Sequence, residues 1–245
     1  NSNLVTFLSA GSIDYLSTLL TKHQHLFKYT EIKEIKCQLN SHTGNKRQSI
    51  SFDENDDQSL GRIVNNVKLE ELLDEELKKR KNIDIKENCE ISSIENISNG
   101  INLNLDDGQR LTSRLFILSS SQNKKILSSI NIKFIKKDLS QTALSITVKG
   151  NLKNKNRAFQ YFTSDGPLAI LPYLDDVASI VWSIKNSSKI LKLSESEIKK
   201  EIISRIKEII DSPEIINLER HHLKFHFAKK LTYKNVVLLG NIAHN

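Results

Sequence analysis

Histidine is the residue type in this sequence that most directly invites a chemical interpretation. His221, His222 and His226 cluster, and His222 and His226 are four positions apart. On a helix, that spacing would point two imidazoles at one zinc ion. The segment alternates polar and apolar residues instead, as a strand does, and it places Arg220 and Lys224 on the same face as His222 and His226. Because neighbouring cations disfavour a divalent metal, we predict an exposed strand face and no metal site.

The sequence contains none of the short motifs that mark common catalytic sites. It has no G-x-S-x-G nucleophile elbow, no G-x-x-x-x-G-K-[ST] phosphate loop and no G-x-G-x-x-G dinucleotide fingerprint. Cys37 and Cys89 are too few for a disulfide framework and lack the spacing of metal ligands, so we expect free thiols in a reducing cytoplasm. Gly240 and Asn241 follow a short apolar run, and spacing alone predicts a plain turn after a buried strand.

The composition is typical of a globular chain. Hydrophobic residues make up 38% and charged residues 27% of the sequence, and no run approaches the ~18 consecutive apolar residues of a membrane span. The net charge of +7 is carried by dispersed lysines, and the aromatic residues do not interleave with a basic stripe. We therefore expect a solvated surface and no nucleic-acid partner, with a weak preference for an anionic membrane surface as the alternative.

Hydrophobic periodicity predicts helices together with antiparallel strands. The helices are expected over 4–27, 67–79 and 194–211. The strands are expected within 30–52, 84–118, 142–184 and 218–227. Ser194 and Glu197 form a predicted capping box at the start of the third helix. The apolar runs 115–118 and 236–240 are short and continuous, which is typical of strands buried inside an α/β sheet.

Three segments resemble the flavin-dependent aromatic hydroxylases of ubiquinone biosynthesis, which belong to the para-hydroxybenzoate-hydroxylase-like class A monooxygenases. The segments are AGSIDYLSTL, FTSDGPLAILPYLDDVASIVW and VVLLGNIAH, in the order that this family has them. The resemblance implies an α/β (α+β) fold in which a partial FAD-binding domain is interleaved with an antiparallel-sheet substrate domain. The FAD-binding remainder is expected over 1–29, 53–131 and 234–245, and the substrate domain over 30–52 and 132–233.

The resemblance also bears on the two ends of the chain. The sequence does not begin with methionine, and it ends just after the Gly-Asn-Ile-Ala-His motif. In similar enzymes a dinucleotide-binding unit precedes the first segment, and a loop and helix follow the last one. We therefore expect a fragment of a longer protein that lacks both regions and is inactive alone.

Cofactor contacts follow from the resemblance, which implies FAD with NAD(P)H or another reductant as electron donor. The family's G-[DN]-A-A-H motif is matched by Gly240, Asn241, Ala243 and His244, and Asn66 matches a position in the helix after the first hairpin. Ser120 and Ser121 stand where the family has an Asp-Gly pair, and a serine brings no charge. The replacement leaves two hypotheses, a divergent hydroxylase or a catalytically degenerate paralogue that acts as a binding or scaffold subunit.

The resemblance implies a polyprenylphenol-type substrate and O₂, and it names no catalytic side chain because the flavin carries the chemistry. Other quinone-biosynthesis proteins are candidate partners, and the expected location is the cytoplasm, with peripheral contact at the inner membrane. The candidate substrate contacts are Phe162, Leu168, Ile170 and Trp182. Apolar strand residues of this type also form ordinary core, which is the alternative for all four.

Overall fold

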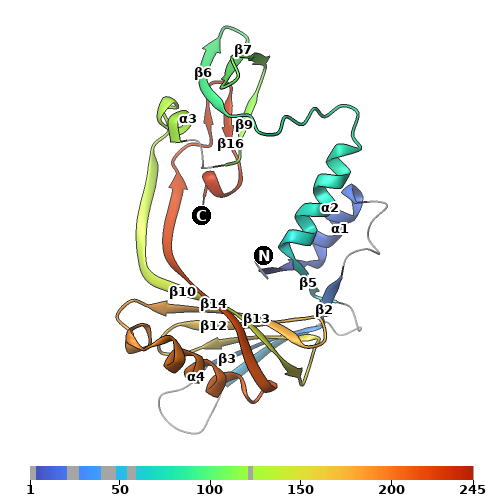
Figure 1. Cartoon of the computed structure of the whole chain (residues 1–245), viewed down its shortest axis with the longest axis vertical. Coiled ribbons are helices and arrows are strands. Elements are labelled where there is room, and N and C mark those ends of the chain that lie inside the picture. Colours follow the sequence, from blue (N-terminus) through green and yellow to red (C-terminus); the bar gives the residue numbers. More distant parts are fainter. Residues whose placement is uncertain (1–3, 21–27, 40–47, 54–58, 121–123, 245) are drawn as a thin grey trace. The chain divides into compact units, whose positions relative to one another are not determined.

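The computed structural model of the chain describes residues 4–20, 28–39, 48–53, 59–120 and 124–244 (Figure 1). The predicted turn at 41–47, most of the acidic loop that follows Phe52, and Ser121 lie outside the described residues. The fold separates into two compact units, Asn1–Ile83 with Gln141–His222 and Asp84–Ser140 with Leu223–Asn245. The two units are defined by packing within this chain, whereas the predicted domains are defined by a family resemblance. The units therefore do not test the predicted domain boundaries, which stay a prediction.

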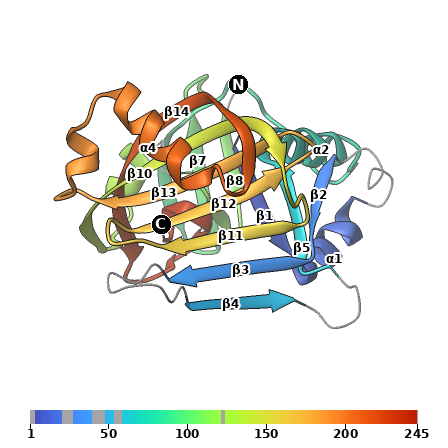
Figure 2. The ribbon, with the colours of Figure 1, turned by 90° about the horizontal axis from the view of Figure 1, so that it is seen from below.

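A seven-stranded sheet forms the centre of the first unit (Figure 2). Its strands, in spatial order, are β14 (Ile210–Ala228), β10 (Phe134–Leu152), β13 (Val177–Lys185), β12 (Pro167–Tyr173), β11 (Arg157–Phe162), β3 (Glu34–Leu39) and β4 (Gln48–Asp53). The described pairings are antiparallel except that of β3 with β11, which is parallel. The hairpin of β3 and β4 therefore extends the sheet at β11.

Helix α4 (Glu195–Ile206) packs on one face of this sheet. The predicted capping box is confirmed, because the Ser194 hydroxyl accepts from the Glu197 backbone and the Glu197 carboxylate accepts from the Ser194 backbone. The isoleucine stripe of α4 is buried against alternate residues of β10, β12 and β13. The helix ends earlier than predicted, at Ile206, and β14 begins at Ile210.

A second, smaller sheet of the first unit has the order β1-β5-β2. Its strands are β1 (Val5–Ser9), β5 (Gly61–Asn65) and β2 (Tyr29–Ile32). The predicted helix over 4–27 was wrong in its first residues: Val5 and Phe7 belong to β1, which pairs with β5. Ser9 accepts a hydrogen bond from the Ser12 backbone and so caps α1 (Ala10–Leu19). Helix α2 (Asn66–Lys78) lies where the periodicity predicted it.

The second unit contains two three-stranded sheets and a short helix. One sheet has the order β6-β7-β8, and the other β15-β16-β9. The elements are β6 (Ile91–Ile97), β7 (Gly100–Leu105), β8 (Arg110–Ser113), β9 (Phe116–Leu118), α3 (Lys124–Ser129), β15 (Thr232–Tyr233) and β16 (Val236–Leu238). The predicted hairpin at Asp107-Gly108 joins β7 to β8, with Gly108 at φ +84°. Across the described residues, no helix is both long and apolar enough to span a membrane.

Candidate functional site

Two parallel strands of the second unit end side by side. β9 pairs with β16 in parallel register, with Leu118 opposite Leu238. The predicted burial is confirmed for Val236 and Leu238 of β16, whereas Ile117 of β9 is 53% exposed because β9 lies at the end of its sheet. The Leu239 amide then donates to the Leu118 carbonyl at 3.0 Å. Ser120 follows β9 and Gly240 follows β16, so both predicted cofactor positions lie at the carboxyl edge of the same sheet. Ligands of open α/β sheets bind at this edge.

The turn after β16 depends on Gly240. Its φ of +67° lies in the left-handed region, while a side chain there would meet no atom within 4 Å. The backbone conformation, and not crowding, therefore favours glycine. The Gly240 carbonyl accepts from the amides of Ala243 at 2.9 Å and His244 at 3.2 Å, which closes the short helix η3 (Gly240–Ile242). Asn241 and His244 are exposed on this turn.

Two contacts from β14 fix the turn in place. The Ala228 amide donates to the Ala243 carbonyl at 2.8 Å, and His226 Nε2 donates to the Ile242 carbonyl at 3.2 Å. The His226 ring also lies against Phe134, with ring centroids 4.6 Å apart. Ala243 is 2% exposed, and both its backbone groups are engaged. Its predicted role as a direct cofactor contact is therefore corrected: Ala243 shapes the turn from within the core.

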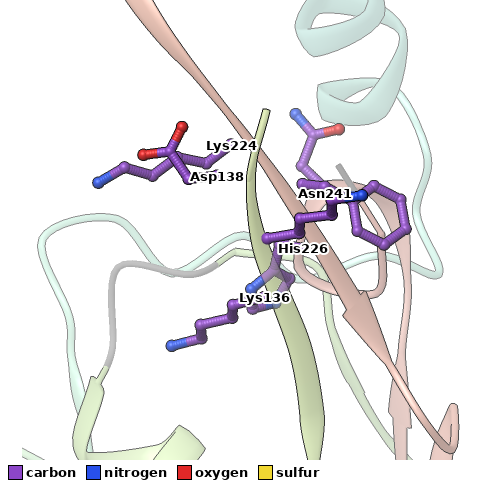
Figure 3. Close-up of a pocket in the computed structure, with 7 residues that line it drawn as sticks. Lys136, Asp138, Lys224, His226 and Asn241 are labelled. Carbon is purple, nitrogen blue, oxygen red and sulfur yellow. The ribbon is translucent and has the colours of Figure 1, made fainter. Parts of the chain in front are cut away.

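A pocket of about 460 Å³ lies beside Asn241. Its other lining residues come from β10 and β14, and they are Lys136, Lys137, Asp138, Lys224, Phe225 and His226 (Figure 3). Lys224 and His226 were predicted to lie together on a strand face, and β14 confirms the strand. Their proximity to the Gly-Asn motif was not predicted, because pairing between segments distant in sequence leaves no local signal.

Ser120 lines a different cavity of the second unit, with a volume of about 670 Å³. Other parts of its wall include Cys89, Asp106, Phe116 and Lys125. The cavity lies next to the end of β9, so the Ser120 hydroxyl is within reach of a ligand there. The cofactor role predicted for Ser120 and Ser121 stays a prediction.

Asn66 belongs to the first unit, at the start of α2. Its side-chain oxygen accepts a hydrogen bond from the Thr6 hydroxyl at 2.6 Å, and its backbone N–H donates to the Leu4 carbonyl at 3.1 Å. The neighbouring Asn65 caps the helix by accepting from the Lys68 backbone. Asn66 is only partly buried, and its predicted contact with FAD stays a prediction.

Three of the four predicted substrate contacts lie in the core beneath α4. Leu168, Ile170 and Trp182 are at most 1% exposed and pack with the isoleucines of that helix. Arg205 of α4 covers the Trp182 ring, with its guanidinium carbon 4.8 Å from the ring centroid. Side chains enclosed in this way cannot touch a ligand, so these three assignments are corrected to core.

Phe162 lies on the opposite face of the sheet and is 46% exposed. Successive pairings carry one row of residues across this face, and the row runs through Ser145, Val181, Ala169, Gln160, Cys37 and Ile50. Phe162 pairs with Leu39 in the adjacent row. Leu39, Ile50 and Phe52 are 49%, 64% and 55% exposed, so this face presents apolar surface at its β11–β3–β4 edge. The face opposite α4 is therefore exposed at this edge, and the predicted substrate contact of Phe162 stays a prediction.

Comparisons with known proteins identify relatives of the sequence. No family model matches the chain. It is 29% identical over 143 residues to the ubiquinone biosynthesis monooxygenase COQ6 of Caenorhabditis elegans, covering 55% of this chain and 31% of that protein. It is 21% identical over 187 residues to the ubiquinone hydroxylase UbiM of Neisseria meningitidis, covering 75% of this chain and 41% of that protein. The matched regions thus span less than half the length of these relatives.

Solved structures with the same fold are similar over almost the whole chain. The p-nitrophenol 4-monooxygenase PnpA of Pseudomonas putida superposes with a TM-score of 0.73 at 13% identity, covering 99% of this chain and 64% of that one. The myxobacterial FAD-dependent halogenase CndH superposes with a TM-score of 0.68 at 13% identity, covering 96% of this chain and 59% of that one. The predicted fold class is confirmed. The chain is similar in sequence to ubiquinone hydroxylases, and its fold is similar to that of the p-nitrophenol 4-monooxygenase PnpA and the FAD-dependent halogenase CndH.

Proposed function

We propose that the whole protein is an FAD-dependent monooxygenase that hydroxylates the ring of a polyprenylated phenol in ubiquinone biosynthesis. The observation that carries this proposal is the shared carboxyl edge of β9 and β16, where Ser120 and the Gly240–Asn241 turn lie together. Dinucleotide cofactors bind at such edges. Relatives named as ubiquinone hydroxylases support the choice of reaction and pathway.

The residues at this edge fit the polar part of FAD. Gly240 carries no side chain, so the backbone of the turn is open to a ligand. The exposed Asn241 amide can both donate and accept, and it is proposed to hydrogen-bond the ribityl or phosphate region. Ser120 is proposed to offer its hydroxyl from the β9 side, and His244 lies exposed at the end of the same turn.

The bound flavin supplies the oxygen chemistry: one atom of O₂ enters the ring as a hydroxyl group, the other leaves as water, and NAD(P)H or another reductant provides two electrons. The chain orients the cofactor and excludes water, and no side chain is assigned as an acid or base. The exposed apolar side chains at the β11–β3–β4 edge suit the polyprenyl tail of the substrate. Phe162 is the predicted substrate contact that remains on the accessible face.

The test uses the full-length gene product, reconstituted with FAD, a reductant and a short-chain polyprenylphenol under isotopically labelled O₂. Mass spectrometry of the product should show one labelled oxygen atom, and omission of the reductant should abolish it. A protein that binds FAD and never labels the phenol would overturn the proposal. That result would favour the second candidate, a degenerate paralogue that acts as a scaffold. The serine at position 120, where the family has an acidic residue, supports this candidate.

A double substitution separates these two candidates at the cofactor. Ser120→Asp with Ser121→Gly restores the family pair, and a regained hydrogen bond from a charged group should tighten FAD binding roughly ten- to hundredfold. The matched control is Ser128→Asp, which adds the same charge on α3, where the Ser128 hydroxyl donates to the Lys125 carbonyl. Flavin fluorescence titration of the apoprotein measures both. Equal effects in the two variants would mean that Ser120 does not face the cofactor.

A further inference from the structure

Two paired segments of the second unit form a ribbon that carries all of that unit's net charge. The segments are 133–140, around the start of β10, and 223–230, around the end of β14, and the two strands are neighbours (Figure 1). The ribbon contains six lysines and one acidic residue, Asp138, for a net charge of +5. The rest of the second unit has six lysines and arginines and six acidic residues. These six lysines are dispersed in the sequence, and strand pairing brings them together.

Strand alternation divides the ribbon into two faces. β10 leaves the second unit and β14 enters it, so the two neighbouring strands run antiparallel. Just beyond them the Lys229 backbone N–H donates to the Lys133 carbonyl at 2.8 Å, which places these residues opposite each other. Residues an even number of positions away share their face. This outer face consists of Lys133, Ile135, Lys137, Leu139, Leu223, Phe225, Phe227 and Lys229.

The other face of the ribbon packs inward. Phe134 and His226 both belong to it, and their ring centroids lie 4.6 Å apart, which agrees with the assignment of the faces. Ala228 is 1% exposed and packs in the core of the second unit. Asp138 is on this face as well, and its carboxylate accepts from the Ser140 backbone at 2.7 Å. The outer face is therefore left with three lysines and no acidic residue.

The apolar side chains of the outer face are exposed to solvent. Four of them are between 39% and 45% exposed, namely Ile135, Leu139, Phe225 and Phe227. The rings of Phe225 and Phe227 stack with their centroids 6.3 Å apart. The three lysines beside them are exposed too, and the ion pairs found among the described residues involve none of these lysines. A group of exposed apolar side chains of this kind marks an interaction surface.

We propose that the outer face docks on an anionic lipid bilayer, where Lys133, Lys137 and Lys229 contact lipid phosphates and the four apolar side chains enter the headgroup region. Apolar area and positive charge on one face are the two properties that hold a protein at such a surface. A second copy of this chain would bring the same positive charge against the face, and the like charges would repel. The surface goes beyond the proposed hydroxylation, and its test needs neither FAD nor a substrate.

Co-sedimentation of the 245-residue chain with lipid vesicles tests the proposal. Vesicles of equal parts phosphatidylglycerol and phosphatidylcholine should bind the chain at least about tenfold more tightly than vesicles of phosphatidylcholine alone. Binding should weaken in concentrated salt, because the Debye length falls from ~10 Å at 0.1 M to ~3 Å at 1 M. No binding to the anionic vesicles, or equal binding to both kinds, would overturn the proposal.

A lysine variant locates the charge that is responsible. Lys137→Gln with Lys229→Gln should weaken binding to the anionic vesicles by about tenfold, because each lysine near the surface contributes to the attraction. The matched control is Lys86→Gln with Lys125→Gln, which removes the same charge from exposed positions of the second unit outside the ribbon. It should retain binding within about twofold. Equal weakening in the two variants would mean that the outer face is not the docking surface.

A phenylalanine variant tests the apolar part of the surface. Phe225→Ser with Phe227→Ser should weaken vesicle binding by about tenfold or more, because the apolar area that enters the interface is lost. Ile97→Ser with Leu111→Ser is the matched control, since these side chains of β6 and β8 are 39% and 36% exposed. Circular dichroism checks the fold, and if the phenylalanine variant unfolds, the lysine variant decides. Sedimentation velocity without lipid should show a monomer, whereas a dimer that the phenylalanine variant dissociates would assign the face to a second copy and overturn the proposal.

Discussion

His226 on β14 and Ile242 in the turn after β16 are joined by a hydrogen bond of 3.2 Å from Nε2 to the carbonyl oxygen. The bond links a strand residue to the motif that bears Gly240 and Asn241. Because Ile242 itself is fully buried, the turn is held from one side by the core and from the other by the imidazole. The exposed Asn241 is therefore presented by a fixed backbone.

His226→Ala should release this turn. Loss of one hydrogen bond and of the contact with Phe134 is expected to lower the free energy of unfolding by about 1 to 2 kcal/mol. Amide hydrogen exchange at Ala243 and His244 should accelerate, since both amides bond within the turn. His221→Ala is the matched control, because His221 lies exposed on the same strand, where its Nε2 is 3.2 Å from a Glu219 carboxylate oxygen. Unchanged exchange at Ala243 would show that His226 does not hold the turn.

Gly240→Ala should be destabilising through backbone conformation alone. A left-handed φ costs an L-residue about 1 to 2 kcal/mol, and there is no clash to add to it. Gly11→Ala in the first turn of α1 has equal space around it and an ordinary φ, so it should be neutral or stabilising by up to about 1 kcal/mol. Urea unfolding of both variants measures the difference. A Gly240→Ala protein as stable as the native chain would contradict the assigned turn.

Trp182→Ala should cost about 3 to 5 kcal/mol, because it opens a cavity in the core beneath α4. Phe162→Ala, on the exposed face, should cost under about 1.5 kcal/mol. Trp182 is the single tryptophan, so the variant without it has no tryptophan emission, and urea unfolding followed by circular dichroism measures both variants. Under the proposed function, Phe162→Ala in the full-length protein should raise the KM for the polyprenylphenol. A small stability loss for Trp182→Ala would return that residue to the list of ligand contacts.

The ion pair between Glu34 of β3 and Arg157 of β11 should make stability depend on pH. Burial raises the pKa of Glu34, but hydrogen bonds from Ser51 and Arg157 and the Arg157 charge outweigh it and leave the pKa below its ordinary value. The unfolded chain then binds the proton more readily. The contribution is therefore complete above the ordinary value of about 4.5 and is lost as pH falls through the lower folded value.

Glu34→Gln should make the free energy of unfolding less dependent on pH in the acidic range. Urea unfolding between acidic and neutral pH measures this dependence. Asp53→Asn is a suitable control, because Asp53 lies opposite Glu34 at the end of β4. Only the Glu34 variant should lose the decrease in the free energy of unfolding that acid causes in the native chain. The same decrease in both proteins would exclude the Glu34–Arg157 pair as its cause.

Local sequence patterns predicted those elements that carry a residue signal of their own. The capping box of α4, the Asp107-Gly108 hairpin and the short apolar strands β9 and β16 were found because each has its own residue signal. The first strand was missed because Val5–Ser9 also fits a helical period. This segment forms a strand because it pairs with β5, which lies about sixty residues later.

The residues of the candidate site also divide into those with a local sequence signal and those without one. The turn at Gly240 and the serine after β9 were found from a motif, and parallel pairing brings them to one edge. Alternation alone could not say which face of the large sheet α4 covers, so Leu168 and Trp182 were assigned to a ligand when they form the core. The cationic pocket was missed because Lys136 and Lys224 come from strands far apart in sequence.

The position of β9 at the end of its sheet has a consequence for handling the chain. Within the described residues β9 pairs only with β16, so its other side presents unpaired backbone groups next to an Ile117 side chain that is 53% exposed. Such an edge is a template on which a strand from another molecule can add. Strand addition at β9 is therefore one route by which concentrated solutions of this chain could self-associate, although only three residues of β9 offer such groups.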